Sequence, residues 1–166
     1  MSHLTEVLNS THEKTDFSCG KNILDNYFIH QASKDVKRKS SACFGKVDSE
    51  TGHIQGYYTL ANSSIPLHLV PAEFQITLHK SYVSIPATLL GRLAIALRYQ
   101  GKGIGKLLLV DALYRSYDNS KHIGSFAVVV DLLDKEAENF YIKYGFIKLP
   151  DSDKMFLAMK TIKDLF

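Results

Sequence analysis

The most informative segment of the chain reads Gln100-Gly101-Lys102-Gly103-Ile104-Gly105. It follows residues 87–97, a run in which only Thr88 and Arg92 carry polar side chains. So little alternation between polar and apolar residues is typical of a strand that is covered on both faces. Residues 106–117 are rich in leucine and predict a helix largely surrounded by protein. The glycines therefore lie between the end of a buried strand and the first turn of a helix.

A turn in this position is suited to hold an anion. The first backbone N–H groups of a helix have no partner within the helix, and the helix dipole favours negative charge there. Glycine has no Cβ, so a pyrophosphate can approach the amides of residues 101–105 closely. Lys102 and Lys106 add positive charge. The segment predicts a phosphate-binding loop, and a glycine-rich turn without a ligand is the alternative.

Two common nucleotide-binding motifs fit the segment less well. A Walker A loop needs a glycine five residues before Gly105, where Gln100 stands, and a serine or threonine where Leu107 stands. The dinucleotide fingerprint needs the spacing G-x-G-x-x-G, whereas Gly101, Gly103 and Gly105 are spaced G-x-G-x-G. The first motif is excluded, and the second stays open as an alternative.

The first half of the chain predicts a helix and a hairpin. Residues 16–20 open the helix, and apolar side chains then recur at helical spacing. These side chains are Ile23, Leu24, Tyr27 and Phe28. Residues 42–47 and 54–60, separated by a polar turn, predict an antiparallel hairpin. Pro66, Pro71 and Pro86 then predict a loop or a short helix rather than sheet.

The second half predicts a strand, a helix and a last strand. Residues 126–130 are apolar, and the order strand, helix, strand forms a right-handed crossover between parallel strands. Asp134 stands at an N-cap position, and Gly145 stands where a glycine ends a helix. Residues 155–159 predict the last strand. The predicted fold class is α/β, or α+β, around one mixed sheet.

Length and composition predict a single domain over residues 1–166. The chain is 45% hydrophobic and 22% charged, which suffices for one core but is short for two ordinary domains. No secretory leader and no apolar run of roughly 20 residues is found, so we expect a cytoplasmic protein without a membrane span. The 7 histidines show no metal-ligand spacing, so we expect no metal. A formal net charge of +3 does not by itself indicate nucleic acid.

The glycine segment and a later segment together resemble the GCN5-related N-acetyltransferases (GNAT). Gln100, Gly103 and Gly105 match the cofactor motif of this family, Q/R-x-x-G-x-G/A. Residues 138–146 read Glu-Asn-Phe-Tyr-Ile-Lys-Tyr-Gly-Phe and match a second family segment. The resemblance covers nearly the whole chain. It implies a mixed sheet splayed between its fourth and fifth strands, with helices on both faces and acetyl-CoA in the V-shaped gap.

The resemblance also assigns binding roles to residues of this chain. The strands beside the gap would be residues 87–97 and 126–130. Backbone groups at the end of the first strand would pair with the pantetheine, and the loop amides would take the pyrophosphate. The cofactor-binding set is Leu93, Ala94, Ile95, Gln100, Gly101, Lys102, Gly103, Ile104, Gly105, Lys106 and Asn139.

Tyr141 is the candidate general acid. Acyl transfer from a thioester to an amine needs a neutral nucleophile and an acid for the leaving thiolate. A phenol with a pKa of about 10 stays protonated at neutral pH and can share its proton with a departing thiolate. Core packing is the alternative, because Phe140, Tyr141 and Tyr144 share a helix face. For Tyr144 we prefer core packing.

The nucleophile is predicted to attack the thioester directly. No His/Asp or Ser/His/Asp constellation stands out near these segments, so a covalent acyl-enzyme is not expected. A lysine ε-amine, with a pKa of about 10.4, would need a strong general base, whereas an α-amine with a pKa of about 8 hardly would. The lack of an obvious base therefore favours an α-amine as the acceptor.

Within the superfamily the chain is most similar to toxins that acetylate the amino acid carried on aminoacyl-tRNA. The matching segments include residues 17–20, 56–60 and 89–94. The resemblance implies a protein that blocks translation, is neutralised by a small DNA-binding antitoxin and forms a homodimer. Arg92, Lys37, Arg38 and Lys39 would contact tRNA phosphate. A solvated helix end for the cluster, and for Arg92 a buried charge with a structural partner, are the alternatives.

Two further functions stay open. One is a GNAT acetyltransferase that acts on a small-molecule or protein amine, which would turn over without RNA. The other is a non-catalytic module that binds acyl-CoA, or a repressor controlled by an antitoxin, which would bind CoA but be indifferent to Tyr141→Phe. A steep fall of RNA affinity with salt would distinguish the tRNA hypothesis from the first of these.

Overall fold

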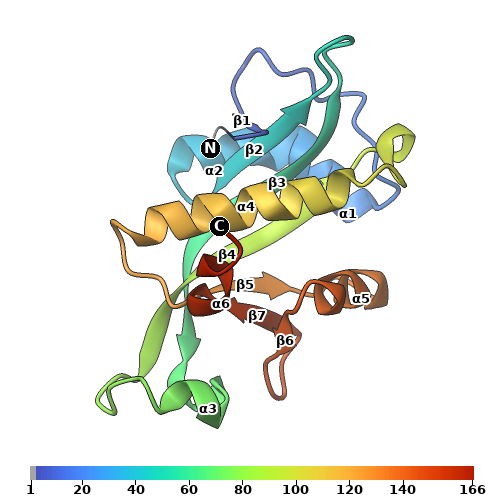
Figure 1. The fold of residues 1–166 in the computed structure, drawn as a ribbon. Coiled ribbons are helices and arrows are strands. Elements are labelled where there is room, and N and C mark those ends of the chain that lie inside the picture. Colours follow the sequence, from blue (N-terminus) through green and yellow to red (C-terminus); the bar gives the residue numbers. More distant parts are fainter. Residues whose placement is uncertain (1–2) are drawn as a thin grey trace. The chain divides into compact units, whose positions relative to one another are not determined.

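The computed structural model describes residues 3–166 and contains one mixed sheet (Figure 1). The strands are β1 (Glu6–Val7), β2 (Ala42–Val47), β3 (Ile54–Pro66), β4 (Ser84–Ile95), β5 (Ala127–Asp131), β6 (Ile147–Lys148) and β7 (Lys154–Ala158). Their order across the sheet is β1-β2-β3-β4-β5-β7-β6. β4 and β5 run parallel, which confirms the predicted crossover, whereas the pairs β1–β2, β2–β3, β5–β7 and β6–β7 are antiparallel.

Helices connect several of these strands. They are α1 (Asn22–Asn26), α2 (Ala32–Arg38), α3 (Ala72–Gln75), α4 (Ile104–Ser120), α5 (Lys135–Lys143) and α6 (Met159–Lys163). A π-helical turn, η1 (Tyr27–Gln31), joins α1 to α2, and the 3-10 turns η2 (Leu67–Leu69) and η3 (Leu97–Tyr99) follow β3 and β4. The chain divides into two units. The first comprises the described residues up to Ala61 together with Leu90–Arg115, and the second comprises Asn62–Leu89 and Ser116–Phe166.

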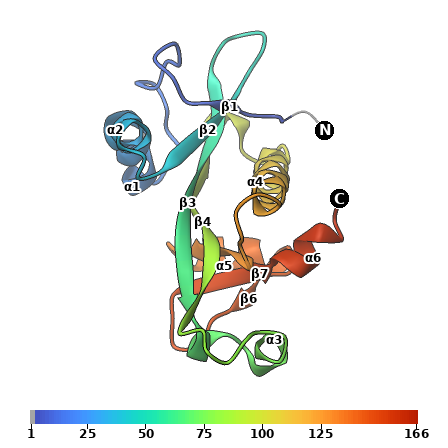
Figure 2. The same cartoon turned by 90° about the vertical axis from the view of Figure 1, so that its left-hand side faces the viewer.

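In the first unit, β3 lies between two helical layers (Figure 2). The ring of Tyr57 is fully buried and stacks on Phe28 of η1, with ring centroids 4.3 Å apart. Gly56 faces the other layer, where an added Cβ would lie 2.8 Å from Leu108 Cδ1 of α4 and 2.7 Å from the Ala94 carbonyl oxygen. α4 can therefore approach the sheet closely only because position 56 has no side chain.

The first predicted helix is present, but a π-helical turn interrupts it. The spacing of apolar residues predicts one regular helix, whereas α1, η1 and α2 follow one another without a break. Two side chains of the turn converge on Asp35 of α2. Tyr27 Oη donates to Asp35 Oδ2 at 2.8 Å, and Gln31 Nε2 donates to Asp35 Oδ1 at 2.9 Å. Such turns inside helices are frequent at functional sites.

A buried polar network joins α4 to β3 and to the start of the chain. Asp111 of α4 accepts hydrogen bonds from Thr5 Oγ1 and Tyr58 Oη, each at 2.6 Å, and from the Leu4 amide at 2.9 Å. Burial works to raise the pKa of Asp111, but these hydrogen bonds outweigh it and hold the pKa below its usual value. The network therefore favours the charged carboxylate.

The second unit is built on β5 and β7. The two strands pair from Ala127↔Ala158 to Asp131↔Lys154. Its buried core cluster consists of Ile65, Val70, Ile85, Ala87, Ala127, Val129, Leu149, Phe156 and Ala158. The ring of Phe74 on α3 packs edge-on against Phe156, with centroids 5.4 Å apart. This core joins the ends of β3 and β4 to the C-terminal strands within the same unit.

The prolines in the middle of the chain only partly follow the prediction. Pro71 precedes α3 and Pro66 ends β3, but Pro86 lies inside β4, contrary to the loop or short helix that the sequence predicts. The Pro86 carbonyl, which proline retains, accepts a hydrogen bond from the Phe126 amide at 2.8 Å, so at this position only the N–H donor is lost. β3 also runs beyond the predicted residue 60, and β6 and α6 are additional.

α5 begins and ends as the sequence predicts. Asp134 Oδ1 accepts a hydrogen bond from the Ala137 amide at 2.9 Å, so Asp134 is the N-cap. At the other end Gly145 has a φ of +91°. The Phe146 amide donates to the Tyr141 carbonyl at 3.1 Å, which closes the helix end. Both boundaries of this helix are therefore set by local sequence.

Candidate active site

The glycine loop lies between β4 and α4, as predicted. Gly101 and Gly103 have φ values of +77° and +79°, and a Cβ at either position would meet nothing within 4 Å. Among the described residues, no backbone acceptor is found for the amides of residues 101–106. The loop therefore offers free N–H groups and open space at the start of a long helix. This geometry fits a phosphate or pyrophosphate group.

The Gln100 side chain holds the loop in place. Its Nε2 donates to the backbone carbonyls of Cys19 and Ile95, both at 2.9 Å. One carbonyl precedes α1 and the other ends β4, so Gln100 ties the loop to two elements of the first unit. Lys102 and Lys106 are exposed beside the glycines. The side-chain contacts of Gln100 are thus structural, while the lysines are available to neutralise an anion.

Leu93, Ala94 and Ile95 form the end of β4. Ala94 is buried, whereas Leu93 and Ile95 are half-buried. The next residue, Ala96, donates its amide to the Gln55 carbonyl at 2.9 Å, which holds this end of β4 against β3.

Arg92, on the same strand, stacks on an aromatic ring. Its guanidinium carbon lies 3.4 Å from the centroid of the Tyr27 ring. Burial, followed by the hydrogen bond to Asp35, raises the pKa of Tyr27 to about 12, so the phenol remains neutral. The sequence leaves open that Arg92 is a buried charge with a structural partner. Arg92 is half-buried and has such a partner in the Tyr27 ring, and its positive charge also helps to lower the pKa of Asp35. Contact with tRNA phosphate stays a prediction.

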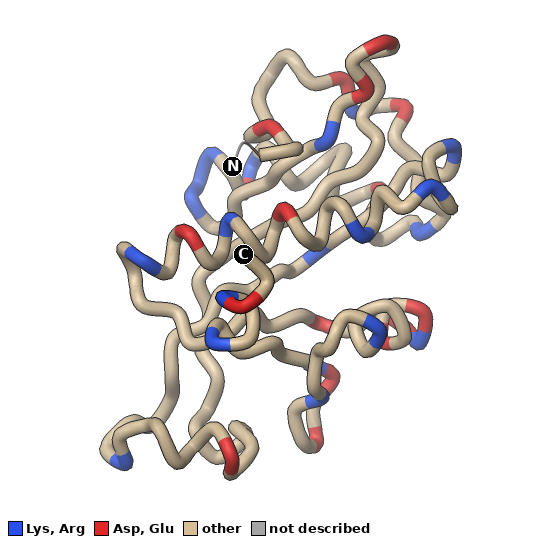
Figure 3. Tube along the Cα trace, viewed as in Figure 1, with Lys and Arg blue, Asp and Glu red and all other residues tan. Residues whose placement is uncertain are grey.

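The basic cluster lies at the end of α2. Lys37 and Arg38 occupy the last turn, and Lys39 follows as the C-cap with a φ of +64°. All three side chains are exposed. Figure 3 shows the positive charge gathered at this end of the helix. Cations at a helix C-terminus are favourable in themselves, so a solvated helix end stays an alternative.

Tyr141 lies in the second unit, on α5. Its side chain is only 6% exposed and packs against Phe140 and Phe146, with ring centroids 5.2 and 5.1 Å away. Burial raises the pKa of this phenol above its ordinary value. The hydroxyl makes no hydrogen bond with the described residues, and it is not completely covered. Asn139, on the same helix, is exposed.

The predicted site residues divide between the two units. The glycine loop, the end of β4, Arg92 and the α2 cluster belong to the first, whereas Asn139 and Tyr141 belong to the second. Within the first unit, folding brings Arg92 to Tyr27 and Gln100 to Cys19, across large separations in sequence. No local pattern predicts either contact.

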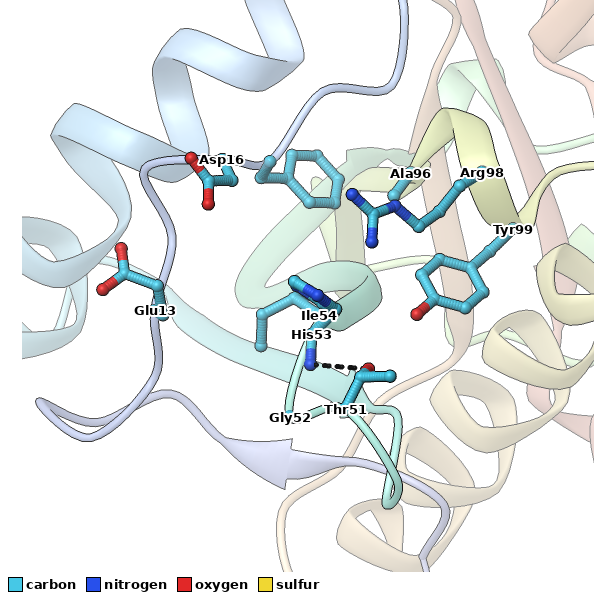
Figure 4. Close-up of a pocket in the computed structure, with 10 residues that line it drawn as sticks. Glu13, Asp16, Thr51, Gly52, His53, Ile54, Ala96, Arg98 and Tyr99 are labelled. Carbon is cyan, nitrogen blue, oxygen red and sulfur yellow. Dashed lines mark hydrogen bonds between the residues drawn. The ribbon is translucent and has the colours of Figure 1, made fainter.

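The first unit also contains a pocket that the sequence does not predict. Its volume is about 160 Å³, and it lies between the segment before α1, the β2–β3 turn and η3 (Figure 4). Arg98 and Tyr99 line one side, and Glu13 and Asp16 stand on the other. Because the lining comes from three distant segments, no spacing rule could have found it.

Two classes of feature are absent from the part of the chain that the structure describes. No three His, Cys, Asp or Glu side chains gather there as metal ligands. No helix among those residues combines the length and the apolar character that crossing a bilayer requires.

Comparison with known proteins supports one family. The family model described as "Acetyltransferase (GNAT) domain" matches residues 68–148. A relative from Mycobacterium tuberculosis, named tRNA-acetylating toxin, is 31% identical over 159 residues, which cover 95% of this chain and 93% of the relative.

Solved structures agree in fold. AtaT complexed with acetyl-methionyl-tRNAfMet has a TM-score of 0.88 at 27% identity, with 98% of each chain covered. A tyrosine-to-phenylalanine mutant of AtaT, bound to the C-terminus of the antitoxin AtaR and acetyl-CoA, has a TM-score of 0.81 at 25% identity, with 98% of this chain and 96% of that chain covered. The chain therefore belongs to the GNAT superfamily of acetyl-CoA-dependent acetyltransferases, in the group that includes the tRNA-acetylating toxins.

Proposed function

We propose that this chain transfers the acetyl group of acetyl-CoA to the α-amine of the amino acid on aminoacyl-tRNA, and that it thereby acts as a translation-blocking toxin. The observation that carries the proposal is the open glycine turn before α4, in a chain 31% identical to a tRNA-acetylating toxin over 95% of its length. Residues 1–166 would form a single catalytic domain.

The cofactor site is proposed to use backbone groups more than side chains. The amides of Gly101, Lys102, Gly103, Ile104 and Gly105 would hold the pyrophosphate. Lys102 and Lys106 would neutralise its charge, and Gln100 would keep the turn in shape. Backbone groups of Leu93, Ala94 and Ile95 would pair with the pantetheine, and Asn139 would contact the cofactor near the thioester. The open space at Gly101 and Gly103 supports this arrangement, because any side chain there would fill it.

Tyr141 is proposed as the general acid. Acetyl-CoA supplies an acetyl group activated as a thioester. As the acceptor nitrogen bonds to the acetyl carbon and the C–S bond breaks, Tyr141 would donate its hydroxyl proton to the departing sulfur. The attacking amine loses a proton in the same reaction, and this proton would restore the phenol through solvent. The raised pKa keeps Tyr141 protonated at the start of each turnover, and it also makes the phenol a weaker acid than an exposed tyrosine, so the role rests on the matched motif.

An α-amine suits this site better than a lysine side chain. No carboxylate or imidazole contacts Tyr141 among the described residues, and the rings beside it are phenylalanines. Without a strong base, the acceptor must lose its proton easily. An α-amine with a pKa of about 8 does so near neutral pH, whereas a lysine amine with a pKa of about 10.4 does not.

Arg92, Lys37, Arg38 and Lys39 are proposed to contact tRNA phosphates. The last three are exposed at the end of α2, where Figure 3 marks the positive charge along the backbone. Such contacts would orient the RNA without reading its sequence. Their strength should fall steeply with salt, because bound counterions are released when phosphates are neutralised.

The protein is further proposed to be cytoplasmic, to form a homodimer and to bind a small DNA-binding antitoxin. Exposed apolar side chains on the second unit support an association surface, since Ile76, Tyr82 and Val83 are 84%, 55% and 87% exposed. The matched AtaT mutant is bound to the C-terminus of its antitoxin.

The proposal is tested by following labelled acetyl from acetyl-CoA to a pool of charged tRNAs, with wild type and with Tyr141→Phe. Label on aminoacyl-tRNA should appear with wild type and fall by roughly 100-fold with the variant, within the range known for loss of a general acid. Tyr144→Phe is the matched control, because it removes a hydroxyl from the same helix and should leave the rate within about twofold.

Three other outcomes would contradict the proposal in different ways. Release of CoA with free amines but no label on RNA would identify a small-molecule or protein acetyltransferase. Equal rates for wild type and Tyr141→Phe would remove Tyr141 from the mechanism. Acetyl-CoA binding without any transfer would indicate a non-catalytic module.

A further inference from the structure

Two arginines of the first unit lie over aromatic rings, but among the described residues only one of them finds hydrogen-bond acceptors for its N–H groups. Arg115 lies over Phe44 at 4.1 Å, and its Nε and Nη2 donate to Tyr58 Oη at 3.1 Å and Thr5 Oγ1 at 3.2 Å. Arg92 lies over Tyr27 at 3.4 Å, and no residue in the described part of the chain accepts its N–H groups. Both arginines therefore contact a ring, but only Arg115 has hydrogen-bond acceptors for its guanidinium N–H groups among the described residues.

The ring beneath Arg92 is itself held in place. Tyr27 belongs to the π turn and donates its hydroxyl to Asp35 Oδ2, while Gln31 donates to Asp35 Oδ1. Both oxygens of Asp35 are therefore engaged, and the hydrogen bonds from Gln31 and then Tyr27 lower the pKa of this carboxylate. A neutral phenol anchored to a charged carboxylate gives Arg92 a fixed platform.

We propose that the guanidinium of Arg92 is a preformed fork, a fixed pair of N–H donors that binds one phosphate of the tRNA acceptor strand. Tyr27 is its positioning residue. The π turn holds Tyr27 in place through the hydrogen bond to Asp35. The proposal rests on the function proposed above and deepens it. A guanidinium offers up to five N–H donors in one plane, and stacking on Tyr27 fixes that plane while the edge stays free. A fork fixed in advance loses little side-chain entropy when a phosphate binds.

Position and charge favour an RNA phosphate as the anion. Arg92 immediately precedes Leu93, Ala94 and Ile95 on β4, so the fork lies next to the strand end proposed to hold the pantetheine. The ring on which it stacks belongs to the same helical run as the exposed lysines and arginine of α2. An RNA strand whose aminoacyl end lies at the thioester and which continues towards α2 would pass this fork.

The experiment measures binding of bulk uncharged tRNA at several KCl concentrations, together with the Kd for acetyl-CoA. Arg92→Gln should weaken tRNA binding by about 10-fold near 0.1 M salt and reduce the slope of log affinity against log salt by about 0.7 to 1. Arg92→Lys should weaken binding by about threefold with the slope retained, because it keeps the charge and loses the fork. Neither variant should change the acetyl-CoA Kd by more than about twofold.

A double-mutant cycle tests whether Tyr27 acts through Arg92. Tyr27→Leu should weaken tRNA binding by about three- to fivefold alone and have no further effect in the Arg92→Gln background. If Tyr27→Leu fails to fold, Tyr27→Phe keeps the ring, removes the bond to Asp35 and should show a smaller effect of the same kind. Arg115→Gln is the matched control and should lower the melting temperature without changing the salt slope.

The possible failures can be told apart. An unchanged tRNA affinity and slope in Arg92→Gln, with aminoacyl-tRNA still acetylated by wild type, would overturn the fork alone. Additive effects of Tyr27→Leu and Arg92→Gln would overturn the positioning role. A weakened acetyl-CoA Kd with unchanged tRNA binding would show that the fork serves the cofactor. Wild-type protein that neither binds nor acetylates tRNA would overturn both the fork and the proposed function.

Discussion

α4 and α5 begin in opposite ways. α5 is capped by its own Asp134, and its first turn carries Glu136 and Glu138, so the positive end of its dipole is neutralised within the protein. α4 follows a turn of glycines, has no acidic residue in its first turn and is preceded by Lys102. A capped helix end contributes stability, whereas an open end keeps its N–H groups for a ligand.

The difference shows where each helix obtains its stability. α5 is held at its ends by the Asp134 cap and by Gly145. α4 is held along its length, by close packing at Gly56 and by the buried Asp111. Fixing α4 through its middle leaves its N-terminal amides free for the cofactor site proposed above.

Adding a carboxylate to the open end should have the largest effect. Gly103→Asp brings negative charge to the start of α4, where about 4 kcal/mol of repulsion acts on a unit charge at 4 Å near a protein surface. After screening, the Kd for acetyl-CoA should rise on the order of 100-fold, measured by calorimetric titration. The melting temperature should change little, because charge at a helix N-terminus partly offsets the strain of a positive φ.

Gly52→Asp is the control for that substitution. Gly52 also has a φ of +77° and open space around an added Cβ, but it lies in the β2–β3 turn. Strain and added charge are therefore matched, and the acetyl-CoA Kd should stay within about twofold of wild type. An equal loss of affinity in both variants would mean that charge near the glycine loop does not decide cofactor binding.

The contacts that stabilise the two helices also differ in how far they can be predicted from the sequence. Asp134 and Gly145 act within a few residues, so local rules predict both ends of α5 correctly. The glycine loop is equally local, and its place between β4 and α4 is predicted. The position of Gly56 against Leu108 and the donors gathered on Asp111 depend on contacts between distant segments, so no spacing rule reveals them.

The candidate site shows the same division. The motif places Gln100 at the start of the loop, but its bonds to Cys19 and Ile95 appear only after folding. Regular helical spacing around Tyr27 conceals the π turn. A single charge in an apolar strand suggests a structural partner for Arg92, but the sequence does not reveal that this partner is an aromatic ring.

Removing the central anchor of α4 should have the next largest effect. Asp111→Asn replaces one of the two carboxylate oxygens, which together accept three hydrogen bonds, with an NH2 group. This NH2 group must then face other donors, either the Thr5 and Tyr58 hydroxyls or the Leu4 amide. The free energy of unfolding at pH 7 should fall by about 2 kcal/mol, measured in urea. Asp118→Asn, on the exposed side of the same helix, should cost less than about 0.5 kcal/mol.

The pH dependence of this difference gives an independent check. The folded pKa of Asp111 lies below its unfolded value, so the stability that the carboxylate contributes is complete above the unfolded pKa of about 3.9. It is lost as the pH falls through the lower, folded pKa. Wild type should therefore exceed Asp111→Asn most above about pH 5, and the gap should shrink below about pH 4. A gap that stays constant down to pH 3 would show that folding does not lower the pKa of Asp111.

The smallest effect is expected where a cap is removed. Asp134→Ala leaves the Ala137 amide without its acceptor and should lower the free energy of unfolding by about 1 kcal/mol, measured in urea. Asp134→Ser should restore most of that loss, because a serine hydroxyl can also cap. Asp134→Ala should leave acetyl-CoA binding nearly intact, while Gly103→Asp removes binding and spares stability. If instead the cap variant lost acetyl-CoA affinity as strongly as Gly103→Asp, the two helix ends would not serve separate purposes, because a stability change of that size cannot by itself empty a cofactor site in a folded protein.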